Sequence, residues 1–399
     1  SLPPPPKMAE VQPKDEAKPQ PEAVKQPADV SPGAGAKASS LTDSISIVNV
    51  PWHRRMETLA VAVFMSALPL FGIIPVTTWF LLFVPYVNIV VALYLTFIFF
   101  IDKAPVTGSR ISMWFRGCKL WVHFKNFFPV SLLKTAELPA DGKYIFGYHP
   151  HGIFSFGAFS AFGTDGCSFS TLFPGVEVHL VTLNITLSFP LLREMYLFLG
   201  MCSASKQTFK NVLSKKGRAV AVVVGGAAES LKSCPGTIDL YLTKRKGFVR
   251  QAFVYETSLV PVLAFGETDT YQVVKAEKAE LIQSRLQKMM GFALPLFFGR
   301  GIFNKLLGIL PFRRPIHVVV GAPIAVPVFA DVTVPEGQDG AGSKRRKRIS
   351  ELGEKWLFKD EGAELVDKIH AQYMDAVRKL YQEHKGRFFI ERAHSMIIE

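Results

Sequence analysis

The chain has 399 residues, of which 49% are hydrophobic and 20% charged, with a mean hydropathy of +0.22 and a formal net charge of +13. It is too apolar for an ordinary soluble enzyme and too charged for a polytopic channel. One part of the chain is therefore expected to lie in a membrane. No recognised nucleic-acid-reading module accompanies the positive charge, so we do not expect nucleic acid as a partner.

Residues 1–45 have a different composition from the rest. They contain four prolines in a row at residues 3–6, followed by Lys, Glu, Gln, Ala and Pro with almost no large apolar side chain. Such a segment cannot bury enough apolar surface to fold. We predict a disordered Pro-rich tail and favour a solvated spacer over a PxxP-type docking site.

Residues 58–101 contain no charged side chain. About 20 apolar residues cross a hydrocarbon core of about 30 Å, so this stretch is long enough to cross twice. Pro69, Pro75 and Pro85 mark places where it can turn or kink. We predict a transmembrane helical hairpin over 58–101. One long kinked helix that crosses once is the alternative and would put the following domain in the lumen.

Basic residues flank this stretch on both sides. They are His53, Arg54 and Arg55 before it, and Lys103, Arg110, Arg116, Lys119 and Lys125 after it. Positive flanks stay on the cytoplasmic side of a membrane. Both ends of the hairpin are therefore expected to face the cytosol.

Short apolar runs alternate with helical patterns in the downstream part of the chain. The runs are residues 178–183, 219–224, 259–265 and 317–320, and the helical patterns include 191–199, 208–213 and 275–289. Buried strands alternating with helices predict an α/β domain with a mostly parallel sheet, which we place at 102–330.

The last part, residues 331–399, is expected to hold a basic loop and an amphipathic helix. The sequence KRRKR at residues 344–348 indicates an exposed loop, for which contact with anionic lipid is favoured over a nuclear signal. Apolar residues then recur at helical spacing: Val366, Ile369, Tyr373, Val377, Leu380 and Tyr381. Packing on the core is expected for this helix, with membrane-surface contact as the alternative.

The segment YIFGYHPHGIFSFG at residues 144–157 sets His149 and His151 at the end of an expected buried strand. Pro150 stiffens the turn, and Gly152 lets the backbone approach a ligand. Free amide groups of a following helix can stabilise a developing oxyanion. Two ordinary loop histidines are the simpler alternative.

A zinc site is the other alternative for this turn. Zinc needs a third and a fourth ligand, and the cysteines are scattered without the close spacing of metal ligands. They are Cys118, Cys167, Cys202 and Cys234, and we expect them to be reduced. We predict no metal.

The HPHG motif with its aromatic, glycine-spaced continuation resembles the type 2 diacylglycerol acyltransferase family, which also contains monoacylglycerol and wax-alcohol acyltransferases. Similar blocks follow in the same order: residues 129–152, 225–230 (GGAAES), 244–252 (KRKGFVRQA), 259–267 (LVPVLAFGE) and 318–324 (VVVGAPI). The resemblance covers roughly residues 51–385. It departs at residues 127–129, which read Phe-Phe-Pro in place of Tyr-Phe-Pro, and at 256–258, where a glycine-containing turn is usual. It implies a glycerolipid-acyltransferase-like α/β fold.

Glu229 is the second candidate for chemistry. Gly225 and Gly226 end a buried strand just before it, and α/β folds bind ligands at this edge of the sheet. Acyl transfer to an alcohol needs a base and a group that orients the base. The resemblance implies His151 as the base and Glu229 as its partner, with His149 in a structural or hydrogen-bonding role. A charge in the first turn of a helix is the ordinary explanation of Glu229.

The nearest rival enzymes are lysophospholipid and glycerol-phosphate acyltransferases. They carry an aspartate five positions after the catalytic histidine, where this chain has Phe154 after His149 and Phe156 after His151. Glu229, from another loop, would have to replace that aspartate.

Four basic residues are expected to bind the phosphates of coenzyme A: Lys244, Arg245, Lys246 and Arg250. Packing or contact with lipid headgroups is the alternative. The backbone at Pro150, Gly152, Gly225 and Gly226 is expected to line the substrate site.

The sequence thus predicts an endoplasmic reticulum membrane enzyme with a cytosolic catalytic domain, which also occurs on lipid droplets. Its partners are acyl-CoA, diacylglycerol and membrane lipids, and it needs no cofactor besides the co-substrate acyl-CoA. Monoacylglycerol or a fatty alcohol is the alternative acceptor. A non-catalytic hairpin protein of lipid droplets is the alternative from a different class of protein. The sequence leaves open whether the protein forms a homo-oligomer.

Overall fold

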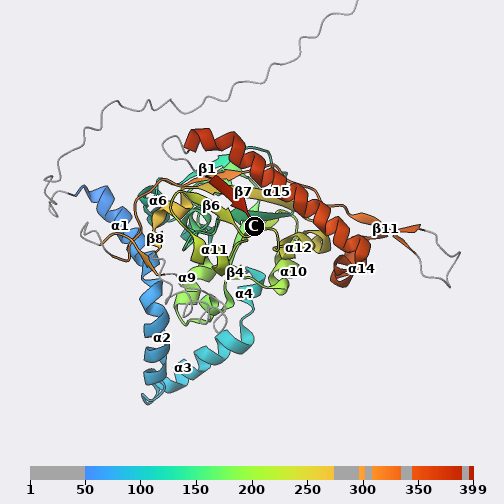
Figure 1. Cartoon of the computed structure of the whole chain (residues 1–399). Coiled ribbons are helices and arrows are strands. Elements are labelled where there is room, and N and C mark those ends of the chain that lie inside the picture. The colour runs from blue at the N-terminus through green and yellow to red at the C-terminus, as the bar shows by residue number, and fades with distance from the viewer. Residues whose placement is uncertain (1–49, 274–295, 302–307, 334–343, 389–394) are drawn as a thin grey trace, which may run out of the picture. The chain divides into compact units, whose positions relative to one another are not determined.

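The computed structural model describes residues 50–273, 296–301, 308–333, 344–388 and 395–399, which belong to one compact unit, Ile47–Glu399 (Figure 1). The predicted tail at 1–45 and the predicted helix at 275–289 lie outside the described residues. The predicted domain boundaries stay predictions.

A seven-stranded sheet forms the centre of this unit. Its order is β1 (Ser131–Lys134), β10 (His317–Val320), β7 (Ser258–Phe265), β2 (Tyr144–His149), β5 (Arg218–Val223), β3 (Glu177–Thr182) and β4 (Cys202–Ser203). Every neighbouring pair is parallel except β10 and β7. The four apolar runs of the sequence are β3, β5, β7 and β10, so the prediction of an α/β fold with a mostly parallel sheet is confirmed.

The central strand β2 shows how the two faces of the sheet are covered. Phe146 and Tyr148 belong to the core on one face, and Ile145 to the core on the other, because successive side chains of a strand point in opposite directions. The first face packs against α1 (Trp52–Met65), α6 (Lys119–Phe127), α7 (Phe156–Ala158), η2 (Phe159–Gly163), α8 (Phe169–Leu172) and α9 (Leu192–Phe198). The second packs against α10 (Lys206–Leu213), α12 (Gly247–Tyr255), α14 (Ile349–Leu352), η5 (Glu354–Phe358) and α15 (Asp360–Phe388).

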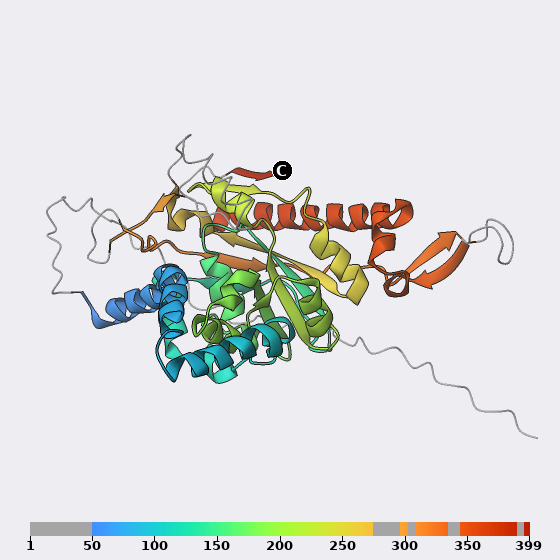
Figure 2. The same ribbon diagram turned by 90° about the horizontal axis from the view of Figure 1, so that it is seen from below.

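The C-terminal helix α15 packs on the sheet, as predicted. Tyr373 and Val377 are fully buried, and the other apolar residues of its stripe lie in the same core. In Figure 2, α15 and the N-terminal helices lie on opposite sides of the sheet.

The apolar segment 58–101 divides into two parts. Helix α1 packs on α6, and its residues Ala60 and Val61 are fully buried, so the start of the predicted hairpin belongs to the protein core. Helices α2 (Ala67–Leu81) and α3 (Val87–Thr96), with η1 (Phe97–Ile101), expose most of their large apolar side chains. The helical run Val87–Thr107, which includes α4 (Ala104–Thr107), is the one in the described part that is long and apolar enough to cross a membrane alone. The pair α1–α2 passes the same test only together and is bent by 45°.

The prediction of a loop at residues 344–348 is wrong. These residues form strand β12 (Lys344–Arg348), which pairs antiparallel with β11 (Phe329–Thr333). The guanidinium groups of Arg346 and Arg348 lie 4.9 and 5.9 Å from the centre of the Phe329 ring. Cross-strand pairing and these cation–π contacts stabilise a strand whose composition alone indicates a loop.

The remaining elements are short. They are α5 (Met113–Arg116), η3 (Asn184–Ser188), α11 (Ala227–Lys232), β6 (Thr237–Leu240), η4 (Glu267–Thr270), β8 (Gln272–Val273), β9 (Phe297–Phe298) and β13 (Ser395–Ile398). β6 pairs parallel with β13 beside the main sheet, and β8 pairs antiparallel with β9.

Candidate active site

The carboxyl ends of β2 and β5 bring the predicted site residues together. The two strands are parallel neighbours, with Tyr148 opposite Val223. His149 ends β2 and the turn with His151 follows it, while the helix α11 with Glu229 follows β5. Adjacent parallel strands deliver their following loops to one edge of a sheet, which explains why residues far apart in the sequence meet here.

The hydrogen bonds around His151 favour one tautomer of its ring. Its Nδ1 lies 3.0 Å from the carbonyl oxygen of Gly152, 2.8 Å from Oγ of Ser230 and 3.4 Å from Oγ of Ser155. A carbonyl oxygen can only accept, and each serine hydroxyl can donate to a nearby carbonyl instead, so Nδ1 carries the hydrogen.

The other ring nitrogen of His151 is the chemically interesting one. With the hydrogen on Nδ1, Nε2 keeps its lone pair, and it has no hydrogen-bond partner in the described part of the chain. Burial lowers the pKa of His151 below its ordinary value of 6.5, which favours the neutral ring. A neutral imidazole with a free nitrogen is what a general base requires.

Glu229 holds the backbone of the turn. One carboxylate oxygen accepts from the amide N–H of His151 at 2.5 Å, and the other accepts from the amide N–H of Tyr241 at 3.3 Å. Burial raises the pKa of Glu229 to about 8, against the lowering effects of the His151 amide and of Arg245. The expected contact between carboxylate and imidazole is replaced by a contact with the amide of the same histidine. Glu229 also stands in the first turn of α11, so the ordinary explanation of this residue fits the geometry as well.

His149 has a different environment from His151. Its side chain is 1% exposed, and its Nε2 lies 3.0 Å from the hydroxyl oxygen of Tyr373 on α15. That hydroxyl donates to the carbonyl of Gly147 at 2.9 Å, so it accepts from Nε2, and His149 carries its hydrogen there. Burial, together with nearby His370, lowers the pKa of His149 to about 3. A neutral, fully enclosed ring fits the predicted structural role.

Glu267 supports the turn from another side. It is 1% exposed and accepts from the Tyr148 hydroxyl at 2.5 Å and from the Gly157 amide at 2.9 Å. Gly152 has a φ of +59°, and a Cβ there would lie 2.8 Å from Cγ of Glu267, so this position favours glycine. The amides of His151 and Gly157 are both occupied by carboxylates. The oxyanion donors expected near this turn are therefore not these two groups.

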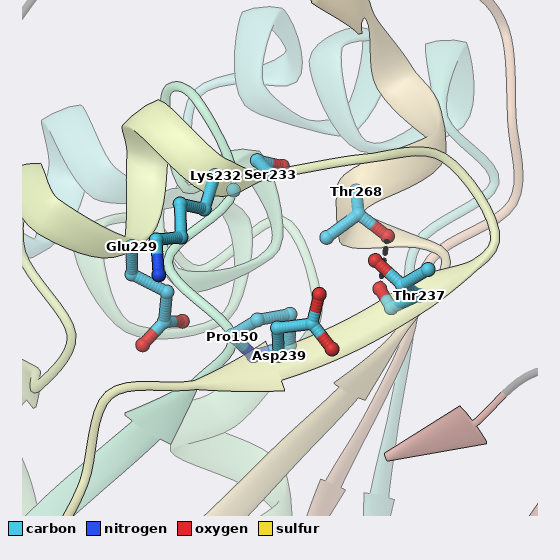
Figure 3. A pocket seen from close by; sticks show the side chains of 8 residues that line it. Pro150, Glu229, Lys232, Ser233, Thr237, Asp239 and Thr268 are labelled. Carbon is cyan, nitrogen blue, oxygen red and sulfur yellow. Dashed lines mark hydrogen bonds between the residues drawn. The ribbon is translucent and has the colours of Figure 1, made fainter. Parts of the chain in front are cut away.

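A narrow depression lies beside Glu229 and Pro150, with too little room to enclose a water molecule (Figure 3). Its lining is Pro150, Gly152, Glu229, Lys232, Ser233, Thr237, Asp239 and Thr268. Two of the four predicted backbone positions, Pro150 and Gly152, are among them. Gly225 lies behind Glu229 instead: a Cβ at this glycine would stand 1.7 Å from the carboxylate, so it makes room for that group.

The four predicted phosphate-binding residues have different surroundings in the structure. Lys246 pairs with Asp367 at 2.6 Å, and the guanidinium of Arg250 lies 4.0 Å from the ring centre of Phe358. Lys244 is exposed. Arg245 alone is brought to the site, where its Nη2 lies 3.4 Å from the carbonyl oxygen of Gly225.

Sequence reasoning missed three residues of this site. Ser230 lies within the GGAAES block beside Glu229, and a search of that block for hydroxyl groups would have found it. Lys232 lines the depression two residues further on. Tyr373 was assigned to the core, and nothing in its helical spacing indicates the bond to His149. In the described residues, no group of three or more His, Cys, Asp or Glu side chains could hold a metal ion.

Fold and site together place His151 and the buried carboxyl group of Glu229 at the strand ends of a mostly parallel α/β sheet. A sequence model described as diacylglycerol acyltransferase matches residues 80–344, which is more than half of the chain. This chain therefore belongs to the diacylglycerol acyltransferase family, as the HPHG motif and the accompanying blocks predicted, and is an acyltransferase of lipid metabolism.

Individual relatives agree with this assignment over most of their length. The chain is 37% identical to diacylglycerol O-acyltransferase 2A of Umbelopsis ramanniana, over 88% of this chain and 92% of the relative. It is also 37% identical to 2-acylglycerol O-acyltransferase 1 of Bos taurus, over 88% and 97%. For the human acyl-CoA wax alcohol acyltransferase 1, the identity is 37% over 74% of this chain and 83% of the relative. No solved structure matches the chain.

Proposed function

We propose that the protein is a membrane-bound enzyme that moves a fatty acyl group from acyl-CoA to diacylglycerol and forms triacylglycerol. The observation that carries this proposal is the His151 ring, neutral and with a free Nε2, at the sheet edge of a chain from this family. A non-catalytic coat protein would not need an ionisable ring held in one tautomer beside a buried carboxyl group.

His151 acts as the general base in the proposed reaction. Its Nε2 takes the proton from the acceptor hydroxyl while the hydroxyl oxygen attacks the carbonyl carbon of the thioester. The tetrahedral intermediate collapses, the carbon–sulfur bond breaks, and the leaving thiolate of coenzyme A takes the proton from His151. The products are an ester and coenzyme A, and the ring returns to its neutral state without any further cofactor.

Glu229 orients this base through the backbone. By accepting from the amide of His151 it holds the turn in place, and Ser230 and Gly152 hold Nδ1. The imidazolium formed during the reaction keeps these contacts on Nδ1, so only the Nε2 proton moves.

The acceptor is tested with purified full-length protein and labelled acyl-CoA. Diacylglycerol, 2-acylglycerol, a long-chain alcohol and a lysophospholipid are offered in parallel. We expect the highest kcat/KM for diacylglycerol. Relatives named for 2-acylglycerol and wax alcohol are as similar as those named for diacylglycerol, so these two acceptors are the second candidates. Transfer only to the lysophospholipid, or to none of the four, would overturn the proposal.

We further propose that α2 and α3 form a hairpin in the endoplasmic reticulum membrane, with the catalytic unit in the cytosol and lipid droplets as a second location. The exposed apolar side chains of both helices and the basic flanks support this arrangement. In intact microsomes, protease should reach tags at the N-terminus and after Glu399. Protection of one tag would show a single crossing instead.

The coenzyme A phosphates are proposed to bind near Arg245, with Lys244, Lys246 and Arg250 contributing charge. Replacing Lys244 and Arg245 by Met should raise KM for acyl-CoA and flatten its salt dependence, while KM for diacylglycerol stays the same. Lys246→Met is the matched control, since Lys246 already pairs with Asp367 and should matter less. An equal loss for both substrates would show that the basic residues bind lipid headgroups.

A further inference from the structure

Part of the catalytic unit exposes large apolar side chains next to the helices α2 and α3. Met113 and Trp114 on α5 are 54% and 80% exposed, and Leu191 and Phe198 at the two ends of α9 are 74% and 44% exposed. We call these four residues the α5–α9 surface. All four belong to the catalytic unit and follow the apolar segment in the sequence.

Two hydrogen bonds connect α3 to α9 and α9 to α5. The hydroxyl of Tyr94 on α3 receives a hydrogen bond from the Leu191 amide at 3.2 Å, at the start of α9. At the other end of α9, the carbonyl of Phe198 accepts from the amide of Ser112 at 2.9 Å, which caps α5. The surface therefore continues directly from a helix that is apolar enough to cross a membrane.

A network of ion pairs fixes α9 against the end of this helical run. Arg193, which is fully buried, pairs with Asp102 at 2.7 Å and with Glu194 at 3.0 Å. Arg110 pairs with the same two acids at 3.1 and 2.6 Å. Two of these pairs, Arg193–Asp102 and Arg110–Glu194, link α9 to the end of the helical run and to the residues just after it.

The backbone at Leu191 adds an independent observation. Leu191 has a φ of +62°, a conformation that costs a non-glycine residue about 1–3 kcal/mol, and yet its side chain is exposed. Exposed Lys103 and Lys119 lie near the surface in sequence and suit anionic headgroups, and Trp114 suits the membrane–water boundary.

We infer that the α5–α9 surface rests in the headgroup region of the bilayer, so that the catalytic unit itself contacts lipid beside the hairpin. This inference depends on the proposed membrane placement of α2 and α3 and goes beyond it. In this arrangement no water-exposed segment separates the hairpin from the catalytic unit. The lipid acceptor can then reach the unit without crossing water.

The test measures lipid contact at single positions of the full-length protein. Cys118 and Cys234 are replaced by Ser, and one cysteine is placed by Trp114→Cys, Leu191→Cys, Phe83→Cys or Lys379→Cys and labelled with an environment-sensitive fluorophore. The protein is reconstituted in phosphatidylcholine–phosphatidylserine vesicles that contain lipid spin-labelled near the headgroup or near the chain end. Phe83, 68% exposed between α2 and α3, reports on the hairpin, and Lys379 on α15 is the control in water.

We expect the headgroup label to quench positions 114 and 191, the deep label to quench 83 more strongly, and neither to quench 379. If 83 is quenched but 114 and 191 behave like 379, the inference is wrong while the membrane hairpin stands. If 83 is also unquenched, the hairpin placement fails too. Crosslinking of two copies through Leu191→Cys without lipid quenching would assign the surface to a second copy and overturn the inference.

A second measurement avoids substitution altogether. The unmodified protein is irradiated with photoactivatable phosphatidylcholine, and the adducts are located by mass spectrometry. Adducts at Met113, Trp114, Leu191 or Phe198 support the inference. Adducts confined to α2 and α3 contradict it.

Discussion

The two histidines of the HPHG turn are one residue apart, yet the two sides of the turn have opposite properties. His149 ends β2 under the C-terminal helix, fully enclosed, with Nε2 occupied by Tyr373. His151 lies above α11, half-buried, with Nδ1 occupied and Nε2 free. The same type of side chain is thus enclosed at position 149 and is the proposed base at position 151, and the difference comes from which ring nitrogen the surrounding groups engage.

Substitution of His151 should cause the largest loss of reaction rate. His151→Ala should lower the turnover of acyl-CoA by about 10²–10⁴-fold, the usual contribution of a general base, with no change in membrane insertion. Initial rates with labelled acyl-CoA in isolated membranes measure it. His384→Ala, which removes an imidazole from α15 far along the chain, is the matched control and should keep wild-type activity. A rate for His151→Ala above about a tenth of wild type would contradict the assignment.

Substitution of Glu229 should cause the second largest loss of reaction rate. Glu229→Ala leaves the buried amide of His151 without an acceptor, which costs about 1–3 kcal/mol, or roughly a 5–150-fold loss of rate if the turn is displaced. Glu229→Gln keeps one acceptor oxygen and should lose less. The kcat values of the two Glu229 variants are compared. The KM for acyl-CoA is measured as the control. Equal activity of both variants would show that the contact with the amide does not matter.

Substitutions around His149 should change the stability of the fold more than the reaction rate. Tyr373→Phe leaves Nε2 of His149 without a partner, removes a hydrogen bond to the carbonyl of Gly147, and should lower the free energy of unfolding by about 1–3 kcal/mol. Gly147→Ala should act in the same way, since a Cβ there would stand 2.0 Å from the Tyr373 hydroxyl oxygen. Thermal unfolding in detergent measures both. If Tyr373→Phe lost activity at an unchanged Tm, the tyrosine would belong to the chemistry instead.

The smallest expected effect is a pH dependence of stability from Glu267. Burial raises its pKa from the ordinary 4.5 to about 7. The folded state therefore favours the protonated acid: the contribution of Glu267 to stability is present below pH 4.5 and is lost as the pH rises through about 7. Glu267→Gln should flatten the dependence of Tm on pH in this window. A slope that is unchanged in this variant would assign the effect to another group.

Much of this site was predictable because its parts lie next to glycines at strand ends. The apolar runs predicted β3, β5, β7 and β10, and parallel neighbours deliver their loops to one edge, so the meeting of His151 and Glu229 followed from sequence. Their actual contact did not. Whether a carboxylate reaches a ring nitrogen or the amide beside it depends on the path of two short turns, which residue types do not determine.

Other features were not predicted because they depend on residues that are far apart in the sequence. Tyr373 lies 226 residues after Gly147, and its hydroxyl reaches the strand because α15 crosses the sheet there. The strand at residues 344–348 has a composition typical of a loop, and its partner β11 decides the outcome through pairing and the Phe329 ring. The second half of helix α1, residues 58–65, was predicted to lie in the membrane because it is apolar, whereas α1 packs against α6 in the core.

The central claim is that His151 presents a free, neutral nitrogen and His149 does not, and selective modification tests it most directly. Diethyl pyrocarbonate acylates accessible neutral imidazoles, and mass spectrometry locates the modified residue in native membranes. We predict that His151 is modified first, that activity falls in parallel, that acyl-CoA protects it, and that His149 reacts only after unfolding. Modification of His149 at the same rate as His151, or an unreactive His151 in the active enzyme, would contradict this account.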